Sequence, residues 1–393
     1  MSLTVLRIRV DQARASGGQV LAIALIELAE AEPLFGHRQA VVRALLEQAA
    51  ALVGELGASA LEGRTLLRLA HVKLSEGDLE GVEQLAGRAS ERLEPAGDID
   101  RLIEAGGLLA RASIRRHHFA AAQARLAGLG DRLDEPQTLA ARRSVAGLAL
   151  AWAELALEQQ QAAEAESRLA VLAAGCADDT DDELIEVSFA CQQARGAAAL
   201  AVGDHARACH ALRAAVGIAK RVGALEDELE ARIALAGALV QRGDQVGREE
   251  ATHHLQLTRD QAIEHELDSM HMAALTGQAG LLAQNGQTQA ALDRCLEIAS
   301  VAVSKHDVFR YAAAVALMSQ IYEQKEDLAS AYRTFAEAHA TLRDTLGDRA
   351  TEIFRAHMSA FANRIGLEKF GEIAEQVNKA AHARQTFRRR TRE

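Results

Sequence analysis

The sequence has little of what builds β-sheets, membrane spans or disulfide frameworks. Only 3% of its 393 residues are aromatic and only three are proline, whereas alanine and leucine are abundant. This composition favours helices and gives β-sandwiches or barrels little material. No uninterrupted apolar run is long enough to cross a membrane, and the N-terminal segment lacks the apolar core of a secretory signal. We therefore expect an all-α protein without a membrane span.

Charge, cysteine and motif content exclude several function classes. The net charge of −11 argues against general nucleic-acid binding. Four cysteines without a close CxxC pair are typical of reduced thiols in a cytoplasmic protein. No phosphate-binding, dinucleotide-binding, zinc-protease or hydrolase motif occurs in a matching context, so we expect no enzyme activity, no catalytic residue and no cofactor. The histidines that stand closest together match no common zinc spacing, so no metal site is expected. They are His253, His254, His265 and His271.

A short polar turn recurs at intervals of 40 to 43 residues. Its marker positions are Gly36, Gly77, His117, Gln160, Gly203, Gly243, Gly286 and Glu326. Seven residues before each marker stands a small residue: Ala29, Ala70, Ala110, Ala153, Gly196, Ala236, Ala279 and Ser319. After each turn comes a second column of mostly small residues that begins at Val41, if three extra residues are allowed after Gly243. A larger apolar column, which begins at Leu45, lies four residues further on. Small residues let two helices cross closely, so the pattern predicts eight antiparallel helix hairpins.

This order of small residue, turn, small residue and larger apolar residue resembles the tetratricopeptide repeat. Gly-Asp at 77–78, 203–204 and 243–244 is similar to that family's turn. The family's period is about 34 residues, so the longer period here adds about one turn to each helix. Repeats of this longer type resemble those in the sensor portions of bacterial transcription regulators of the maltose-activator type. The resemblance implies a right-handed superhelical solenoid from residue 19 to about 346.

The predicted organisation has five segments. They are a lead-in (1–18), hairpins one to four (19–176), hairpins five to eight (177–346), capping helices (347–383) and an Arg-rich flexible tail (384–393). We expect the eight hairpins to form one continuous array, with the acidic stretch 175–183 as a solvated linker. Asp98 and Asp307 stand where helix N-caps are needed.

Two segments after the last hairpin have alternative interpretations. The apolar stripe of 348–383 is interpreted as a cap over the terminal repeat, and the alternative is a helix that forms a homodimer. The arginines of the tail are interpreted as a solvated end, and the alternative is a contact to an acidic surface or to nucleic acid. The candidates for such a contact are Arg388, Arg389 and Arg390.

The resemblance places the functional surface on the concave face, which the first helix of each hairpin builds. The candidate partner-binding residues there are Arg64, His71, Glu104, Arg111, Glu154, Gln193, Glu230, Gln320 and Glu323. The Lys/Asn set that clamps a C-terminal carboxylate in chaperone-binding members of the family is not matched. Our leading hypothesis is a non-enzymatic scaffold or adaptor that binds a partner protein or peptide. The alternative is a regulatory or sensor protein that responds to a ligand or peptide, and a third is the sensor part of a larger signalling protein.

Overall fold

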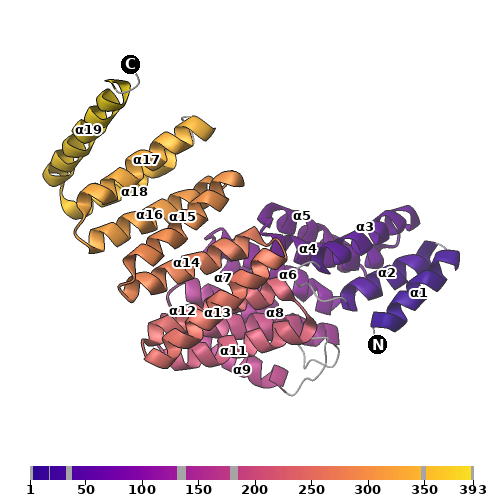
Figure 1. Cartoon of the computed structure of the whole chain (residues 1–393). Coiled ribbons are helices and arrows are strands. Elements are labelled where there is room, and N and C mark those ends of the chain that lie inside the picture. Colours follow the sequence, from indigo (N-terminus) through magenta and orange to yellow (C-terminus); the bar gives the residue numbers. More distant parts are fainter. Residues whose placement is uncertain are drawn as a thin grey trace. The chain divides into compact units, whose positions relative to one another are not determined.

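The computed structural model describes residues 3–16, 18–31, 38–130, 139–177, 185–346 and 351–390. Within these ranges the chain forms nineteen α-helices and no β-strand (Figure 1). None of these helices combines the length and the apolar character that crossing a membrane requires. The all-α prediction is confirmed.

The helices are numbered in chain order. They are α1 (Leu3–Ser16), α2 (Gly18–Ala31), α3 (Arg38–Leu56), α4 (Ser59–Glu76), α5 (Leu79–Leu93), α6 (Ile99–Arg115), α7 (Phe119–Gly130), α8 (Leu139–Glu158), α9 (Ala162–Ala177), α10 (Ile185–Ala201), α11 (His205–Val222), α12 (Leu225–Arg242), α13 (Gln245–Glu264), α14 (Asp268–Gln284), α15 (Thr288–Ser304), α16 (Val308–Gln324), α17 (Leu328–Leu346), α18 (Ile353–Ile365) and α19 (Leu367–Arg390). They fall into two compact units, Met1–Arg242 and Gly243–Glu393. The boundary lies in the turn of the sixth predicted hairpin.

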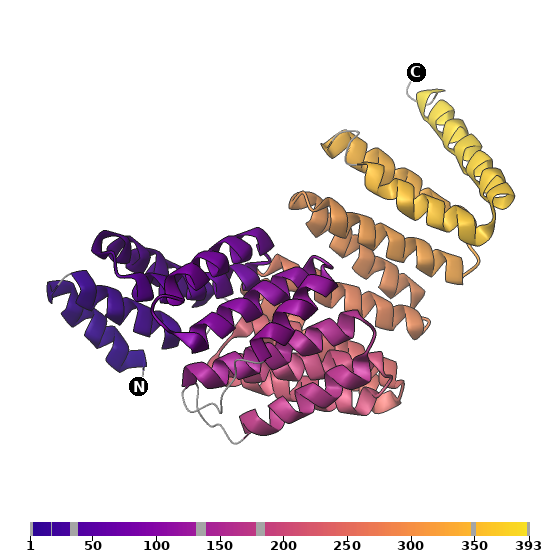
Figure 2. The same ribbon diagram turned by 180° about the vertical axis from the view of Figure 1, so that it is seen from behind.

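Unit 1 is built from helix hairpins in two layers. The pairs α2–α3, α4–α5, α6–α7, α8–α9 and α10–α11 pack together, and each second helix also packs against the following first helix (Figure 2). Successive first helices contact each other directly, as α2–α4, α4–α6, α6–α8 and α8–α10. The first helices therefore form a continuous inner layer of unit 1.

The turn markers share one backbone conformation. All seven that the structure describes have positive φ, from 59° at Glu326 to 80° at Gly243, while Gly36 lies outside the described residues. A left-handed residue ends a helix and reverses the chain, and glycine adopts this conformation without steric cost. At four of these turns an aspartate follows the marker, and its side chain accepts from a backbone N–H at the start of the next helix. The Asp78 side chain accepts a hydrogen bond from the backbone N–H of Gly81 at 2.9 Å. Asp98 and Asp307 are N-caps as predicted.

The columns of small residues mark close helix crossings. Every member of the first column is buried, from Ala29 to Ser319. A Cβ atom added to Gly196 in α10 would lie 2.6 Å from Cγ of Leu212 in α11, which is too close for any side chain. The prediction of hairpins with closely crossing helices is therefore confirmed at this pair.

The first hairpin departs from the expected register. Val41 is 46% exposed and Leu45 is half-buried, whereas Val42 and Leu46 are fully buried. The equal spacing assumed after Gly36 was therefore wrong by one residue. One residue turns a helix by about 100°, which is enough to move a side chain off the buried face.

Unit 2 ends in an aromatic core. Phe335 of α17 lies against Phe354 and Phe361 of α18, with ring centroids 6.4 and 6.0 Å away. Ile373 and Val377 of α19 are buried in the same core. Most of the described apolar stripe of 348–383 thus packs within unit 2. α19 extends through Arg390, but the side chains of Arg388, Arg389 and Arg390 lie outside the described residues.

Candidate functional site

A hollow of about 250 Å³ opens on the inner layer of unit 1. Side chains from α4, α6, α8 and α10 line it, together with one residue near the start of α12. Its charged and titratable lining residues are Arg68, His71, Glu104, Arg111, Arg115 and Asp227, and its apolar ones include Leu74, Leu108, Leu148, Val187 and Phe189. The hollow thus combines an apolar wall with several arginines, an arrangement that can hold a ligand with one apolar and one anionic part.

The hollow forms because two repeats place small residues on the inner layer. Thirteen positions before their turn markers, the second and third hairpins carry Arg64 and Glu104. The fourth and fifth hairpins carry Gly147 and Ala190 at the same position. Among the described residues, no other side chain lies within 4 Å of where a Cβ of Gly147 would stand. The space that long side chains fill in earlier repeats is therefore left open here.

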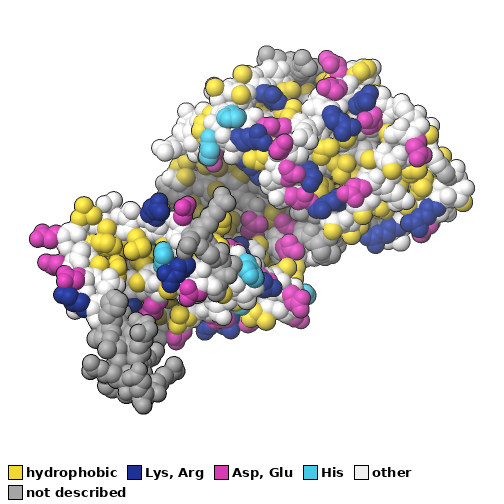
Figure 3. Space-filling view, turned by 90° about the horizontal axis from the view of Figure 1, so that it is seen from above, with side chains coloured by type: hydrophobic (Ala, Val, Ile, Leu, Met, Phe, Trp, Pro, Cys, Tyr) yellow, Lys and Arg dark blue, Asp and Glu magenta, His cyan; other side chains and the backbone are white. Residues whose placement is uncertain are grey.

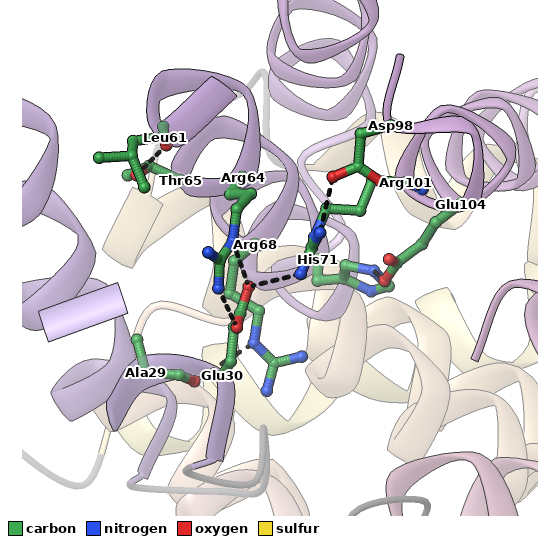
Figure 4. A network of polar contacts seen from close by, with 10 residues as sticks. All are labelled: Ala29, Glu30, Leu61, Arg64, Thr65, Arg68, His71, Asp98, Arg101 and Glu104. Atoms are coloured by element: carbon green, nitrogen blue, oxygen red, sulfur yellow. Dashed lines mark hydrogen bonds and ion pairs between the residues drawn. The ribbon is translucent and has the colours of Figure 1, made fainter. Parts of the chain in front are cut away.

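Ion pairs join the first helices around the hollow (Figure 4). Arg64 of α4 donates two hydrogen bonds to the Glu30 carboxylate of α2, at 2.7 and 3.2 Å. His71 Nε2 of α4 lies 2.6 Å from Oε1 of Glu104 in α6. Arg101 of α6 lies 3.8 Å from the same Glu30 carboxylate. The Arg64–Glu30 and His71–Glu104 pairs each connect one repeat to the next, and the Arg101–Glu30 contact connects the first repeat to the third. These helices are therefore held together by ion pairs before any ligand binds.

Arg111 and Glu154 form the next pair of this series. Arg111 Nη2 donates to Glu154 Oε1 at 2.5 Å, and its Nε lies 3.0 Å from both carboxylate oxygens. Burial acts to lower the pKa of Arg111, but the Glu154 charge and these hydrogen bonds outweigh it and raise the pKa above its usual value. The Arg111 guanidinium is therefore held against a carboxylate of opposite charge.

Arg115 has no such partner. Its Nη1 donates a 3.0 Å hydrogen bond to the backbone carbonyl of Leu74, and it forms no ion pair with a carboxylate of the described residues. The residue as a whole is exposed, yet partial burial of its guanidinium and the positive charge of Arg111 lower its pKa. Arg115 is thus a cation at the hollow that pairs with no carboxylate of the part of the chain that the structure describes.

The structure brings together part of the predicted site. His71, Glu104, Arg111 and Gln193 line the hollow. Glu154 lies beside it as the partner of Arg111.

The remaining candidates lie elsewhere. Arg64 pairs with Glu30, and Glu230 is exposed on α12. Gln320 and Glu323 belong to α16 of unit 2, where Gln320 is exposed and Glu323 accepts from Arg364 at 2.8 Å. Most of the charged candidates are therefore engaged with other side chains and do not project freely.

Sequence reasoning missed Arg68, Arg115 and Phe189. One sequence signal could have located the hollow. Thirteen positions before the turn marker, Gly147 and Ala190 stand where the earlier hairpins carry Arg64 and Glu104.

Other surfaces give weaker indications of a functional site. Basic and acidic side chains lie interspersed on the face that Figure 3 shows. Within the described ranges, no group of three or more His, Cys, Asp or Glu side chains could hold a metal ion. Two of the clustered histidines lie near carboxylates, His254 at 3.7 Å from Glu250 and His271 at 3.4 Å from Glu297.

Comparison with known proteins identifies the fold. No protein-family model and no curated protein sequence matches this chain. Among solved structures it is similar to a signal transduction ATPase with numerous domains from Pyrococcus horikoshii that carries a tetratricopeptide-repeat sensor. The TM-score is 0.61 at 14% identity, over 90% of this chain and 55% of that one, so this chain spans about half of that protein.

Two further solved structures are similar over nearly their whole length. The apo form of RapI gives a TM-score of 0.59 at 10% identity, over 82% of this chain and 92% of that one. The apo form of the quorum sensor NprR from B. thuringiensis gives 0.51 at 13% identity, over 82% and 95%. At these identities the likeness shows a shared fold, a helical repeat of the tetratricopeptide type.

Proposed function

We propose that this chain is a non-enzymatic binding protein that takes a peptide, or an extended segment of a partner protein, onto the first helices of unit 1. The observation that carries the proposal is the hollow beside Arg115, on an inner layer where Arg64, His71 and Arg111 are each paired with a carboxylate. A surface that is already ordered loses little conformational entropy when it binds. The proposal includes a cytoplasmic location and neither a cofactor nor a metal.

The size of the hollow fits a peptide better than a large cofactor. Pockets for drug-sized ligands usually measure about 300–1,000 Å³. A volume of about 250 Å³ accommodates one or two side chains of a peptide whose remainder lies along the inner layer. An extended peptide would thus contact several repeats while the hollow selects one of its residues.

A regulatory role is the second candidate, and one observation favours it. The hollow is lined by five helices of successive repeats, so one ligand would contact all of them and bias their packing. Similar folds support the idea. A Rap protein complexed with competence and sporulation factor gives a TM-score of 0.51 at 12% identity, over 95% of this chain and 100% of that one. NprR is described as a quorum sensor. In this version the chain would act like the sensor portions of maltose-activator-type regulators.

Other surfaces have less support. A homodimer through 348–383 would need an exposed apolar stripe, but Phe354, Phe361, Ile373 and Val377 are buried within unit 2. Leu367, which is 74% exposed, is the exception. The tail contact through Arg388 to Arg390 remains an alternative that the experiment below includes.

The test is a peptide selection with a variant that fills the hollow. A displayed library of random peptides with free C-termini is selected against the full chain, and the enriched peptides are measured against Gly147→Phe. A Cβ at this position meets open space, and phenylalanine has a higher helix propensity than glycine, so the variant should fold. The matched control is Gly217→Phe on α11, where a Cβ also meets open space and the residue is exposed.

Peptides that bind the wild type and Gly217→Phe but lose at least tenfold in affinity for Gly147→Phe would support the proposal. If all enriched peptides bind the three proteins equally, the hollow is not the site. If truncation of residues 384–393 abolishes their binding instead, the tail is the site. For the regulatory version, hydrogen exchange with bound peptide should slow in α12 as well as in α6 and α8.

A further inference from the structure

We infer that the hollow recognises a carboxylate of the bound peptide and that Arg115 is the residue that holds it. This inference rests on the function proposed above and names the chemistry of the ligand. It comes from three observations: the charge balance around Arg115, the hydrogen-bonding capacity that this residue retains, and the apolar wall beside it.

The charge balance sets Arg115 apart from its neighbours. Arg111, one helical turn earlier, is paired with Glu154. Arg116, the next residue, is paired with Glu83 at 3.1 Å. Arg115 lies between them without a carboxylate partner, and it is the one of the three that both lines the hollow and lacks an ion pair among the described residues. A ligand carboxylate would supply the missing negative charge.

The guanidinium of Arg115 retains most of its donors. A guanidinium carries five N–H donors in one plane, and the described contacts of Arg115 use one nitrogen, Nη1, which donates to Leu74 O. The planar fork that remains matches the two oxygens of a carboxylate. The Leu74 carbonyl also accepts from Gly77 N at 3.2 Å, so it does not depend on Arg115.

The apolar wall strengthens such a contact. Leu148 and Phe189 line the same hollow as Arg115. An ion pair with an apolar wall on one side is stronger than one in bulk water, because the effective dielectric constant is lower. A residue that offers an apolar stem and a carboxylate end, such as glutamate or a C-terminal leucine, fits both features.

The neighbouring acidic groups favour a ligand group with one negative charge over a group with two. Glu104 and Asp227 line the hollow, and the negative charge of Glu154 acts on Arg115 from beside it. A phosphate group, which carries a charge of about −1.5 to −2 at neutral pH, would be repelled by these carboxylates more strongly than a carboxylate. We therefore assign a carboxylate and not a phosphate.

The experiment uses the peptides selected above that are sensitive to Gly147→Phe. Each peptide is synthesised as selected, in versions with each Asp or Glu changed singly to Asn or Gln, and in a version with an amidated C-terminus. A further version carries phosphoserine in place of the acidic residue whose neutralisation weakens binding. Affinities are measured for the full-length wild type, Arg115→Gln and the matched control Arg116→Gln. Thermal melts establish that both variants fold.

The expected result is that neutralising one carboxylate, either a side chain or the C-terminus, weakens binding to the wild type about tenfold. The same neutralisation should change the affinity for Arg115→Gln about twofold or less, because the carboxylate has then already lost its partner. Arg116→Gln should behave like the wild type. The phosphoserine peptide should bind more weakly than the carboxylate peptide.

Three outcomes would overturn the inference. In the first outcome, some peptides are sensitive to Gly147→Phe, but neutralising their carboxylates leaves their affinity for the wild type unchanged or lowers it equally for the wild type and Arg115→Gln. The proposed function then stands, and the assignment of a carboxylate to Arg115 is wrong. If the phosphoserine peptide binds more tightly, the ligand is a phosphate. If no selected peptide is sensitive to Gly147→Phe, the proposed function fails and the inference fails with it.

Discussion

A bidentate ion pair between Arg111 of α6 and Glu154 of α8 joins two successive first helices. The two residues are 43 positions apart in the chain. The pairs Glu30–Arg64 and His71–Glu104 repeat this relationship at separations of 34 and 33 residues. Each pair crosses from one repeat to the next. The inner layer of unit 1 is therefore cross-linked by charge as well as by packing.

Removing one member of the central pair should destabilise the protein. Glu154→Leu leaves the Arg111 guanidinium without its carboxylate, and we expect a loss of about 2–4 kcal/mol in the free energy of unfolding. The double variant Arg111→Leu with Glu154→Leu should lose less than the sum of the two single variants, because no unpaired charge remains. Urea unfolding of the four proteins measures this coupling. Additive losses would contradict the pairing.

The turn at Gln160 offers a stabilising substitution. Gln160 has φ of 61°, which costs a residue with a side chain about 1 kcal/mol or more relative to glycine. We expect Gln160→Gly to raise the free energy of unfolding by about 0.5–1 kcal/mol. The control Gln159→Gly, where φ is not positive, should lower it. A loss of stability in Gln160→Gly would show that the turn does not need the left-handed conformation.

The close crossing of α10 and α11 predicts that a glycine-to-alanine substitution has opposite effects on stability at Gly196 and at Gly217. Gly196→Ala should destabilise by about 1–3 kcal/mol, because the new methyl group would meet Leu212. Gly217→Ala places the same methyl group in open space and should stabilise by up to about 1 kcal/mol through helix propensity. Thermal or urea unfolding distinguishes them. Equal effects would mean that the two helices do not cross at Gly196.

Sequence reasoning predicted the hairpins because local sterics determine them. A left-handed residue such as Gly203 and a small residue such as Gly196 leave a signal at fixed spacing. The shifted register of Val42 and the end of unit 1 at Arg242 leave no such signal. The ion pairs depend on which long side chains meet after folding, about one repeat apart. The hollow arises from absent side chains, which spacing alone does not show.

The burial of Cys295 predicts that the stability of the protein falls at alkaline pH. Burial raises the pKa of its thiol to about 12, so the folded protein keeps this proton where the unfolded chain loses it. The contribution to stability is therefore full below about pH 9 and falls by about 1.4 kcal/mol per pH unit as the pH rises towards 12. Unfolding measured across this range should depend less steeply on pH in Cys295→Ala. The native thiol should also resist alkylation by iodoacetamide at pH 8, and rapid labelling would contradict its burial.

The central claim is that partners bind on the first helices of unit 1, and photo-cross-linking tests it most directly. A selected peptide that carries a benzoylphenylalanine is irradiated with the full-length protein, and the labelled residues are identified by mass spectrometry. The account predicts labels on α6, α8 and α10 around the hollow, which disappear when unlabelled peptide competes. Competable labels confined to α19, or to second helices such as α11, would contradict it.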